Sequence, residues 1–201
     1  RRQRQMCIRD RNLTAADAKS PVAIITGGGT GIGAASATAL AARGCRIVVN
    51  YQRSQEGANE TIARCQDFGV EAVSVQGSIA KDEDCRRILD ETINTFGRVD
   101  LLVNNAGVTR FADQKDLDAL DAADFEHIMS VNVAGSYQMT RAAVPFLEKS
   151  DRAAVVNVSS HSGISGIGSS MAYAASKGAL NTLTLSLARN LAPWIRVNAV
   201  C

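Results

Sequence analysis

The chain has 201 residues, and its 46% hydrophobic content is sufficient for the packed core of a single domain. Net charge is +2, aromatic residues make up 4%, and the basic residues form no stripe beyond the N-terminal cluster, so nothing supports nucleic-acid binding. No apolar run approaches the roughly 18 residues of a membrane span, and we predict no membrane partner.

Residues 1–19 are predicted to be a disordered or artefactual extension. The first eleven residues are rich in arginine and show no helical or strand periodicity. A targeting peptide is the other interpretation, although a secretory signal needs an apolar stretch that is missing here. We therefore place the folded domain at residues 20–201.

The domain opens with a strand, a glycine turn and a helix. The apolar run from Val22 to Ile25 is typical of a parallel strand covered on both faces. Glycines in the turn allow the backbone to approach a ligand, and free amides at the start of a helix near 31–43 favour a pyrophosphate. An ordinary strand-to-helix turn is the alternative. The predicted cofactor-binding residues of this turn are Gly27, Thr30, Gly31, Ile32 and Gly33.

The second strand predicts which dinucleotide binds. An NAD site usually has an acidic residue at the end of this strand, about twenty residues after the turn, to hold the ribose hydroxyls. Here the strand ends without an acid, and Arg53 is placed to bind a 2′-phosphate, with Asn50 and Ser54 as neutral partners. We therefore favour NADP(H) over NAD(H), with a solvated loop arginine as the alternative for Arg53.

Strand and helix patterns continue to alternate along the chain. Strands are expected near 22–26, 46–50, 71–75, 99–103, 153–158 and 195–200, and helices near 31–43, 55–68, 81–96, 116–148 and 170–191. Such an array predicts a single Rossmann-like α/β domain, with a doubly wound parallel sheet and helices on both faces. Ligands bind beyond the carboxyl ends of the strands in such sheets. Gly27, Asn105 and Ser160 each follow a strand directly.

A proton-transfer site is indicated by Tyr173 and Lys177, with Ser160 thirteen residues before the tyrosine. On a helix, the i, i+4 spacing brings the Cβ atoms of Tyr173 and Lys177 to roughly 5–6 Å. A cation there stabilises the phenolate, so the tyrosine can give or take a proton at a carbonyl or alcohol oxygen. Alone the pair is a weak signal, because such pairs are common on solvated helix faces.

Together these motifs resemble the short-chain dehydrogenase/reductase family. The segment Thr26-Gly27-x-x-x-Gly31-x-Gly33 matches its cofactor turn, and residues 104–107, Asn-Asn-Ala-Gly, match the motif after its fourth strand. Its catalytic tetrad is matched by Asn132, Ser160, Tyr173 and Lys177. Within the family, the chain is most similar to 3-oxoacyl-acyl-carrier-protein reductases.

The resemblance implies an oxidoreductase that transfers a hydride between NADP(H) and a small carbonyl or alcohol substrate. It implies that Tyr173 donates the proton, Ser160 bonds the substrate oxygen and Asn132 anchors a water. Tyr173 and Lys177 are also predicted to contact the cofactor, with Lys177 holding the nicotinamide ribose. A non-catalytic NAD(P)-binding sensor or scaffold is the alternative. The resemblance also implies that the adenosine-ribose side of the cofactor is lined by Asn105, Ala106 and Gly107.

One position departs from the family pattern. The family usually has an aspartate at position 78, which accepts a hydrogen bond from the adenine amino group, whereas this chain has Ser78, followed by Ile79. We predict that both residues contact the cofactor, and that the neutral hydroxyl of Ser78 accepts this bond less strongly.

Cysteine and histidine usage agrees with a cytoplasmic enzyme without metal. The five cysteines are scattered, odd in number and without Cys-x-x-Cys spacing, and the two histidines form no ligand cluster. We therefore interpret the thiols as reduced and predict no metal site.

The C-terminus is expected to be incomplete. Members of the family continue beyond the sixth strand into a substrate-covering segment and a seventh strand, so we predict a fragment of marginal stability and weak activity. For the full-length protein a homo-oligomer, dimer or tetramer, is predicted. Leu180, Leu183, Leu187 and Leu191 form a helical stripe that suits either a subunit interface or the core.

Overall fold

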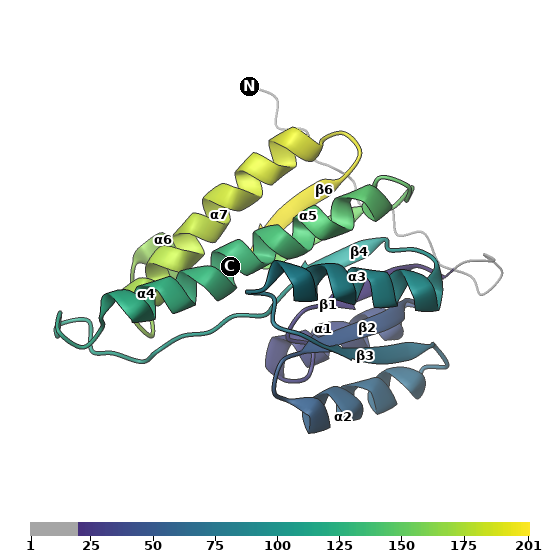
Figure 1. The fold of residues 1–201 in the computed structure, drawn as a ribbon, viewed down its shortest axis with the longest axis horizontal. Helices are drawn as coiled ribbons and strands as arrows, with labels where there is room; N and C mark the ends of the chain where they lie inside the picture. Colours follow the sequence, from purple (N-terminus) through teal and green to yellow (C-terminus); the bar gives the residue numbers. More distant parts are fainter. Residues whose placement is uncertain (1–19) are drawn as a thin grey trace.

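The computed structural model describes residues 20–201, so the predictions for residues 1–19 lie outside the described part of the chain. Six parallel strands form one sheet in the order β3-β2-β1-β4-β5-β6 (Figure 1). The strands are β1 Val22–Ile25, β2 Arg46–Tyr51, β3 Ala72–Gln76, β4 Leu101–Asn104, β5 Ala154–Val158 and β6 Arg196–Val200. The predicted doubly wound sheet is confirmed, because the strand order reverses between β1 and β4.

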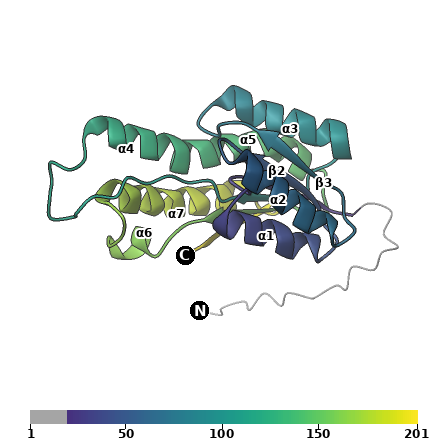
Figure 2. The same ribbon diagram turned by 90° about the horizontal axis from the view of Figure 1, so that it is seen from below.

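Helices cover both faces of the sheet. They are α1 Gly31–Ala41, α2 Gln55–Gln66, α3 Asp82–Phe96, α4 Ala122–Met129, the π-helical segment η1 Ser130–Gly135, α5 Ser136–Leu147, α6 Ser162–Ser165 and α7 Met171–Leu191. Helices α1 and α2 lie on one face and α3 on the other (Figure 2). Alternate residues of β1 feed two separate cores: Val22 and Ile24 face one, Ala23 and Ile25 the other.

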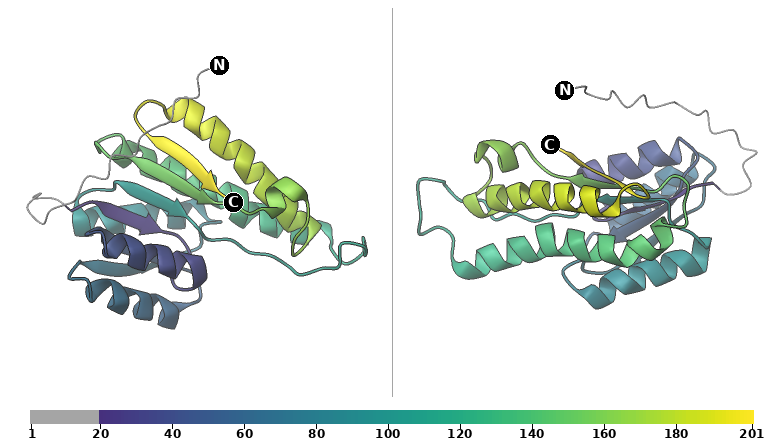
Figure 3. Two further views of the ribbon diagram at one scale, coloured as in Figure 1. Left: turned by 180° about the vertical axis from the view of Figure 1, so that it is seen from behind. Right: turned by 90° about the horizontal axis from the view of Figure 1, so that it is seen from above.

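The leucine stripe of α7 belongs largely to the core. Leu180 is fully buried, while Leu187 and Leu191 pack against the core that also contains Met139 and Leu147. The structure therefore favours the core over the interface for most of this stripe. Figure 3 shows α7 lying along β6, which forms the edge of the sheet within residues 20–201.

The helix predicted at 116–148 was wrong in its start and in its continuity. Asp113 and Asp116 instead accept hydrogen bonds from the amides two residues ahead, and these turns compete with helix formation. The helix begins only after Asp121, whose carboxylate caps it by accepting from the amide of Asp124. It is then interrupted by η1, and such π-helical turns are frequent at functional sites.

A buried carboxylate ties together the amino ends of the central strands. Asp100 is fully buried and accepts hydrogen bonds from the amide of Val22, the hydroxyl of Ser150 and the guanidinium of Arg98. Burial alone would raise the pKa of Asp100, but the bonds from Arg98, Ser150 and Val22 outweigh burial and hold the pKa below its ordinary value. The carboxylate therefore stays ionised and links β1 to the segments that precede β4 and β5.

Candidate active site

The glycine turn after β1 presents free backbone donors. Gly27 and Gly31 have positive φ angles of 61° and 55°, and a Cβ at Gly31 would meet no atom within 4 Å. Within residues 20–201, the amides of Gly31, Ile32 and Gly33 have no hydrogen-bond acceptor, and the first turn of α1 holds no acidic residue. Unpaired amides at a helix N-terminus with open space before them fit the pyrophosphate of a dinucleotide.

The segment after β4 holds this turn in place. Asn105 donates from its side-chain amide to the carbonyls of Thr26 (3.0 Å) and Gly27 (3.1 Å). In return, the hydroxyl of Thr26 accepts from the backbone amides of Asn105 and Ala106, both at 3.0 Å. Gly33 has no room for a side chain, because a Cβ would overlap Gly27 O and Asn105 Nδ2. The predicted motifs at 26–33 and 104–107 thus form one locked unit.

A cavity of about 460 Å³ opens beside this unit at the carboxyl ends of the strands. Its walls include every residue predicted to bind the cofactor apart from Gly33, Tyr173 and Lys177. The lining residues that were not among the predicted cofactor contacts are Gly29, Tyr51, Gln52, Gly77, Val108, His127 and Val131. A larger hollow of about 740 Å³, beside Arg46 and Lys149, lies at the amino ends of the strands. None of the predicted site residues lines it, so the functional site is placed at the carboxyl edge.

The residues at the end of β2 differ in how freely they face this cavity. Asn50 lines it, but its Nδ2 donates to the carbonyls of Val75 (3.2 Å) and Gly77 (3.0 Å), which commits the amide nitrogen to β3. Arg53 and Ser54 are exposed at its rim, and among residues 20–201 the Arg53 guanidinium has no hydrogen-bond or ion-pair partner. Arg53 is therefore the available cation at this end.

Lys177 and Tyr173 lie one turn apart on α7, next to the far end of the cavity. The Lys177 Nζ is 5.6 Å from the centroid of the Tyr173 ring and donates to the carbonyl of Val158 at 2.7 Å. Neither residue lines the cavity itself, whereas Gly107 and Val108 do. A Cβ at Gly107 would nevertheless lie only 3.6 Å from Lys177 Nζ, so the ammonium stands directly behind the cavity wall.

Asn132 acts on the same wall from η1. Its Oδ1 accepts from the amide of Val108 (2.8 Å), and its Nδ2 donates to the carbonyl of Val108 (3.0 Å) and to Ser176 Oγ (2.9 Å). The side chain therefore joins the segment after β4 to α7. For the water-anchoring role implied by the resemblance, Asn132 has the second lone pair of Oδ1 and its main-chain carbonyl, which also accepts from Ser136 Oγ at the start of α5.

Ser160 follows β5 and has a serine neighbour that the sequence did not indicate. The Ser160 hydroxyl donates to Ser162 Oγ and accepts from the amide of Ser162, both at 3.1 Å. Ser162 opens the short helix α6, which was also not predicted. A Cβ at Gly168 would overlap Ser162 Oγ and lie 3.9 Å from Tyr173 Cδ1. Ser162 therefore bonds to Ser160 and also lies beside Gly168, which is next to the Tyr173 ring.

Lys177 should make the free energy of unfolding depend on pH in the alkaline range. Burial lowers the pKa of this lysine to about 8 from its ordinary 10.5. Between these values the unfolded chain binds more protons, so the free energy of unfolding should rise with pH across this window, by about 3 kcal/mol. Urea unfolding of wild type and Lys177→Met at pH 7.5, 9 and 10.5 measures this contribution as the change in their difference. A difference that is independent of pH would contradict it.

Sequence reasoning missed the residues that act through shape and backbone bonding. Ser176 lies inside the Tyr-x-x-x-Lys motif, and its hydroxyl holds both Asn132 and the carbonyl of Tyr173. Nothing in its spacing distinguishes it from a solvated serine.

Among the described residues, no cluster of three or more acidic, histidine or cysteine side chains is arranged to hold a metal. No described helix has the length and apolar character to cross a membrane.

The fold and the cavity define an α/β protein with a site suited to a dinucleotide, and Tyr173 and Lys177 lie close together on α7 outside the cavity lining. The family model described as short chain dehydrogenase matches residues 21–201. The chain belongs to this family of NAD(P)-dependent oxidoreductases, as its resemblance implied.

Relatives with known names or structures support the assignment. A Streptomyces violaceoruber protein named as a ketoacyl reductase of the granaticin polyketide synthase is 43% identical over 182 residues, covering 90% of this chain and 72% of the relative. A Burkholderia xenovorans structure assigned to the family is 47% identical, with a TM-score of 0.88, and covers 90% of this chain and 75% of its own. The structure of NAD⁺-bound xylitol dehydrogenase is 33% identical, with a TM-score of 0.83, and the match covers 90% and 69%.

Proposed function

We propose that this protein interconverts a carbonyl and an alcohol with NADP(H), in the manner of a 3-oxoacyl reductase. One observation carries the proposal: the ammonium of Lys177 lies 5.6 Å from the centroid of the Tyr173 ring and 3.6 Å from the Cβ position of Gly107, a residue that lines the cavity. This arrangement supports a role for Tyr173 as the proton donor beside a site suited to a dinucleotide. The ketoacyl reductase named among the relatives supports the substrate class.

Each tetrad residue has a separate role in the proposed reduction of the carbonyl. A bound nicotinamide supplies the hydride to the carbonyl carbon. Tyr173 gives its phenolic proton to the carbonyl oxygen, and Ser160 donates a hydrogen bond to the same oxygen. The ammonium of Lys177 stabilises the phenolate that remains. Asn132 holds Val108 and Ser176 so that the wall between cavity and α7 keeps its shape.

The preference for NADP(H) rests on Arg53. Its guanidinium is exposed and unpaired among residues 20–201, and residues 50–54 at the end of β2 include no carboxylate to repel a 2′-phosphate. We expect Arg53→Ala to weaken NADPH binding by roughly tenfold and to leave NADH binding within about twofold, since a charged hydrogen bond contributes about 1.5–3 kcal/mol. Fluorescence titration with both reduced cofactors measures this effect.

The control for Arg53 is Arg43→Ala, which removes an exposed arginine that does not line the cavity. Wild type binding NADH more tightly than NADPH would reject the NADP(H) preference. Oxidation of either cofactor with a panel of ketones and 3-oxoacyl thioesters tests the reaction class, and binding without turnover on every substrate would favour the non-catalytic alternative. A homo-oligomer and a cytoplasmic location stay predictions.

A further inference from the structure

The segment between β3 and α3, residues 76–79, forms one wall of the cavity without belonging fully to any element. Gln76 ends β3, while Gly77, Ser78 and Ile79 lie between strand and helix and line the cavity. Backbone outside regular structure needs other partners to hold its polar groups. The shape of this wall therefore depends on side chains that reach it from elsewhere.

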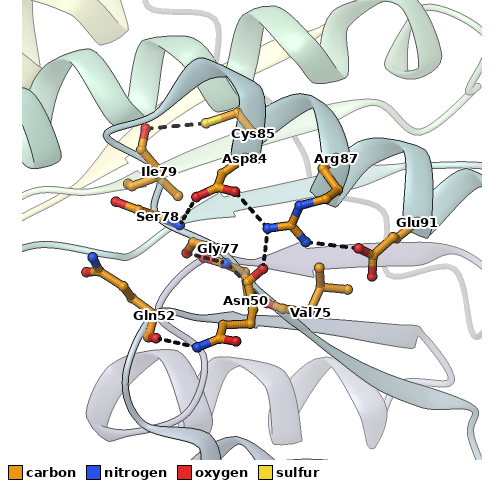
Figure 4. Close-up of polar contacts among 11 residues, drawn as sticks. Asn50, Gln52, Val75, Gly77, Ser78, Ile79, Asp84, Cys85, Arg87 and Glu91 are labelled. Atoms are coloured by element: carbon orange, nitrogen blue, oxygen red, sulfur yellow. Dashed lines mark hydrogen bonds and ion pairs between the residues drawn. The ribbon is translucent and has the colours of Figure 1, made fainter.

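Two side chains of α3 bind this segment from the side away from the cavity. Asp84 accepts from the amide of Ser78 through Oδ2 at 2.9 Å, and from Arg87 Nη2 through Oδ1 at 2.7 Å (Figure 4). The same Arg87 Nη2 donates to the carbonyl of Gln76 at 2.8 Å. The contact is close, because a Cβ on Gly77 would lie 3.2 Å from Arg87 Nη2 and 3.4 Å from Asp84 Cβ.

Strand β2 fixes the same segment from its other side. The amide of Gly77 donates to the carbonyl of Tyr51 at 2.8 Å, and the carbonyl of Gly77 accepts from Asn50 at 3.0 Å. After these bonds two polar groups of the cavity-lining residues 77–79 are left without partners within residues 20–201: the hydroxyl of Ser78 and the amide of Ile79. They are adjacent on the cavity wall and offer a hydroxyl donor or acceptor next to an N–H donor.

The placement of these two groups suits the adenine end of the ligand. A pyrophosphate at the start of α1 and a nicotinamide beside Lys177 would direct the adenosine half of a dinucleotide toward the ends of β2 and β3.

The charge of Asp84 is satisfied by Arg87 and by the Ser78 amide, whose hydrogen bonds hold the pKa of this carboxyl below its ordinary value. The carboxylate thus stays ionised and bound to the segment.

We propose that Asp84 and Arg87 are positioning residues for adenosine binding: they hold residues 76–78 so that Ser78 Oγ and the Ile79 amide face the base. This inference rests on the proposed function, because it requires a dinucleotide in the cavity. Neither residue touches the ligand. Their effect is to order the wall before binding, which lowers the entropy lost when the base is bound.

Affinity for parts of the ligand tests this proposal. We expect Asp84→Ala to raise the dissociation constants of both NADPH and NADH roughly tenfold, and to leave reduced nicotinamide mononucleotide, which lacks the adenosine half, within twofold of wild type. Asp84→Asn keeps one oxygen for the Ser78 amide and should recover part of the loss. Amide hydrogen exchange should show faster exchange at Ser78 in Asp84→Ala, a readout that needs no ligand.

A neighbouring ion pair supplies the matched control. Asp82 lies in the same first turn of α3, but it binds Arg86 and Arg141 and does not reach the wall. Asp82→Ala should leave cofactor affinity and Ser78 exchange unchanged. Equal behaviour of Asp84→Ala and Asp82→Ala, or equal weakening of the mononucleotide and the dinucleotides, would overturn the inference alone. A wild-type chain that binds neither NADPH nor NADH would instead reject the proposed function, and this inference with it.

Discussion

Replacing Tyr173 by phenylalanine should reduce turnover at least about 10²-fold and up to about 10⁴-fold, the range typical of a general acid. The variant keeps the ring that lies 5.6 Å from Lys177 Nζ and loses only the hydroxyl. NADPH affinity should stay within about twofold, because Tyr173 does not line the cavity proposed for the cofactor. Steady-state oxidation of NADPH with a 3-oxoacyl thioester and fluorescence titration of the cofactor measure the two effects separately.

Tyr137→Phe is the matched control for this experiment. Tyr137 is exposed on α5, stacks with Arg141 and lines no part of the cavity. Its loss should leave turnover unchanged. A Tyr173→Phe protein that retains a tenth or more of wild-type activity would show that another group protonates the substrate, and the assignment of the general acid would be wrong.

The second large effect is on stability, and it concerns Asp100. Asp100→Ala leaves the amide of Val22 and the guanidinium of Arg98 without their buried acceptor. Breaking a buried ion pair on one side costs about 3–5 kcal/mol. The lower figure applies here, because the Arg98 side chain is 26% exposed and retains access to water. Urea unfolding at pH 7 should show this loss, which is a large share of the roughly 5–15 kcal/mol of a typical domain.

The same carboxylate predicts acid sensitivity. Because folding lowers the pKa of Asp100, its contribution is fully present above the ordinary value of 3.8 and is lost as pH falls through the lower folded value. The difference between wild type and Asp100→Ala should therefore shrink in acid. The control is Asp151→Ala, at an exposed position between α5 and β5. Its free energy of unfolding should stay within about 0.5 kcal/mol of wild type. A loss of stability under about 1 kcal/mol for Asp100→Ala would contradict the proposed contribution of the buried Asp100 carboxylate.

Local patterns were sufficient for the strands and most helices. Apolar runs and glycine positions are properties of neighbours along the chain, and they predicted β1–β6 and the turn at 26–33. The tetrad positions came from the family resemblance, and their catalytic roles stay predictions. The 116–148 helix failed because aspartate turns and a capping box stop it locally, while its apolar periodicity suggested continuity.

What each predicted side chain does was decided only by the tertiary structure. Asn132 binds the backbone of Val108, Asn50 binds carbonyls of β3, and Ser160 pairs with Ser162. For Asn132 and Asn50, as for Asp84, the partner lies in a separate element, brought close by the winding of the sheet. By itself the sequence determined the family fold and the residue types of an oxidoreductase site. Folding determined which of their polar atoms are occupied and which are free, because hydrogen bonding depends on distances that residue spacing does not contain.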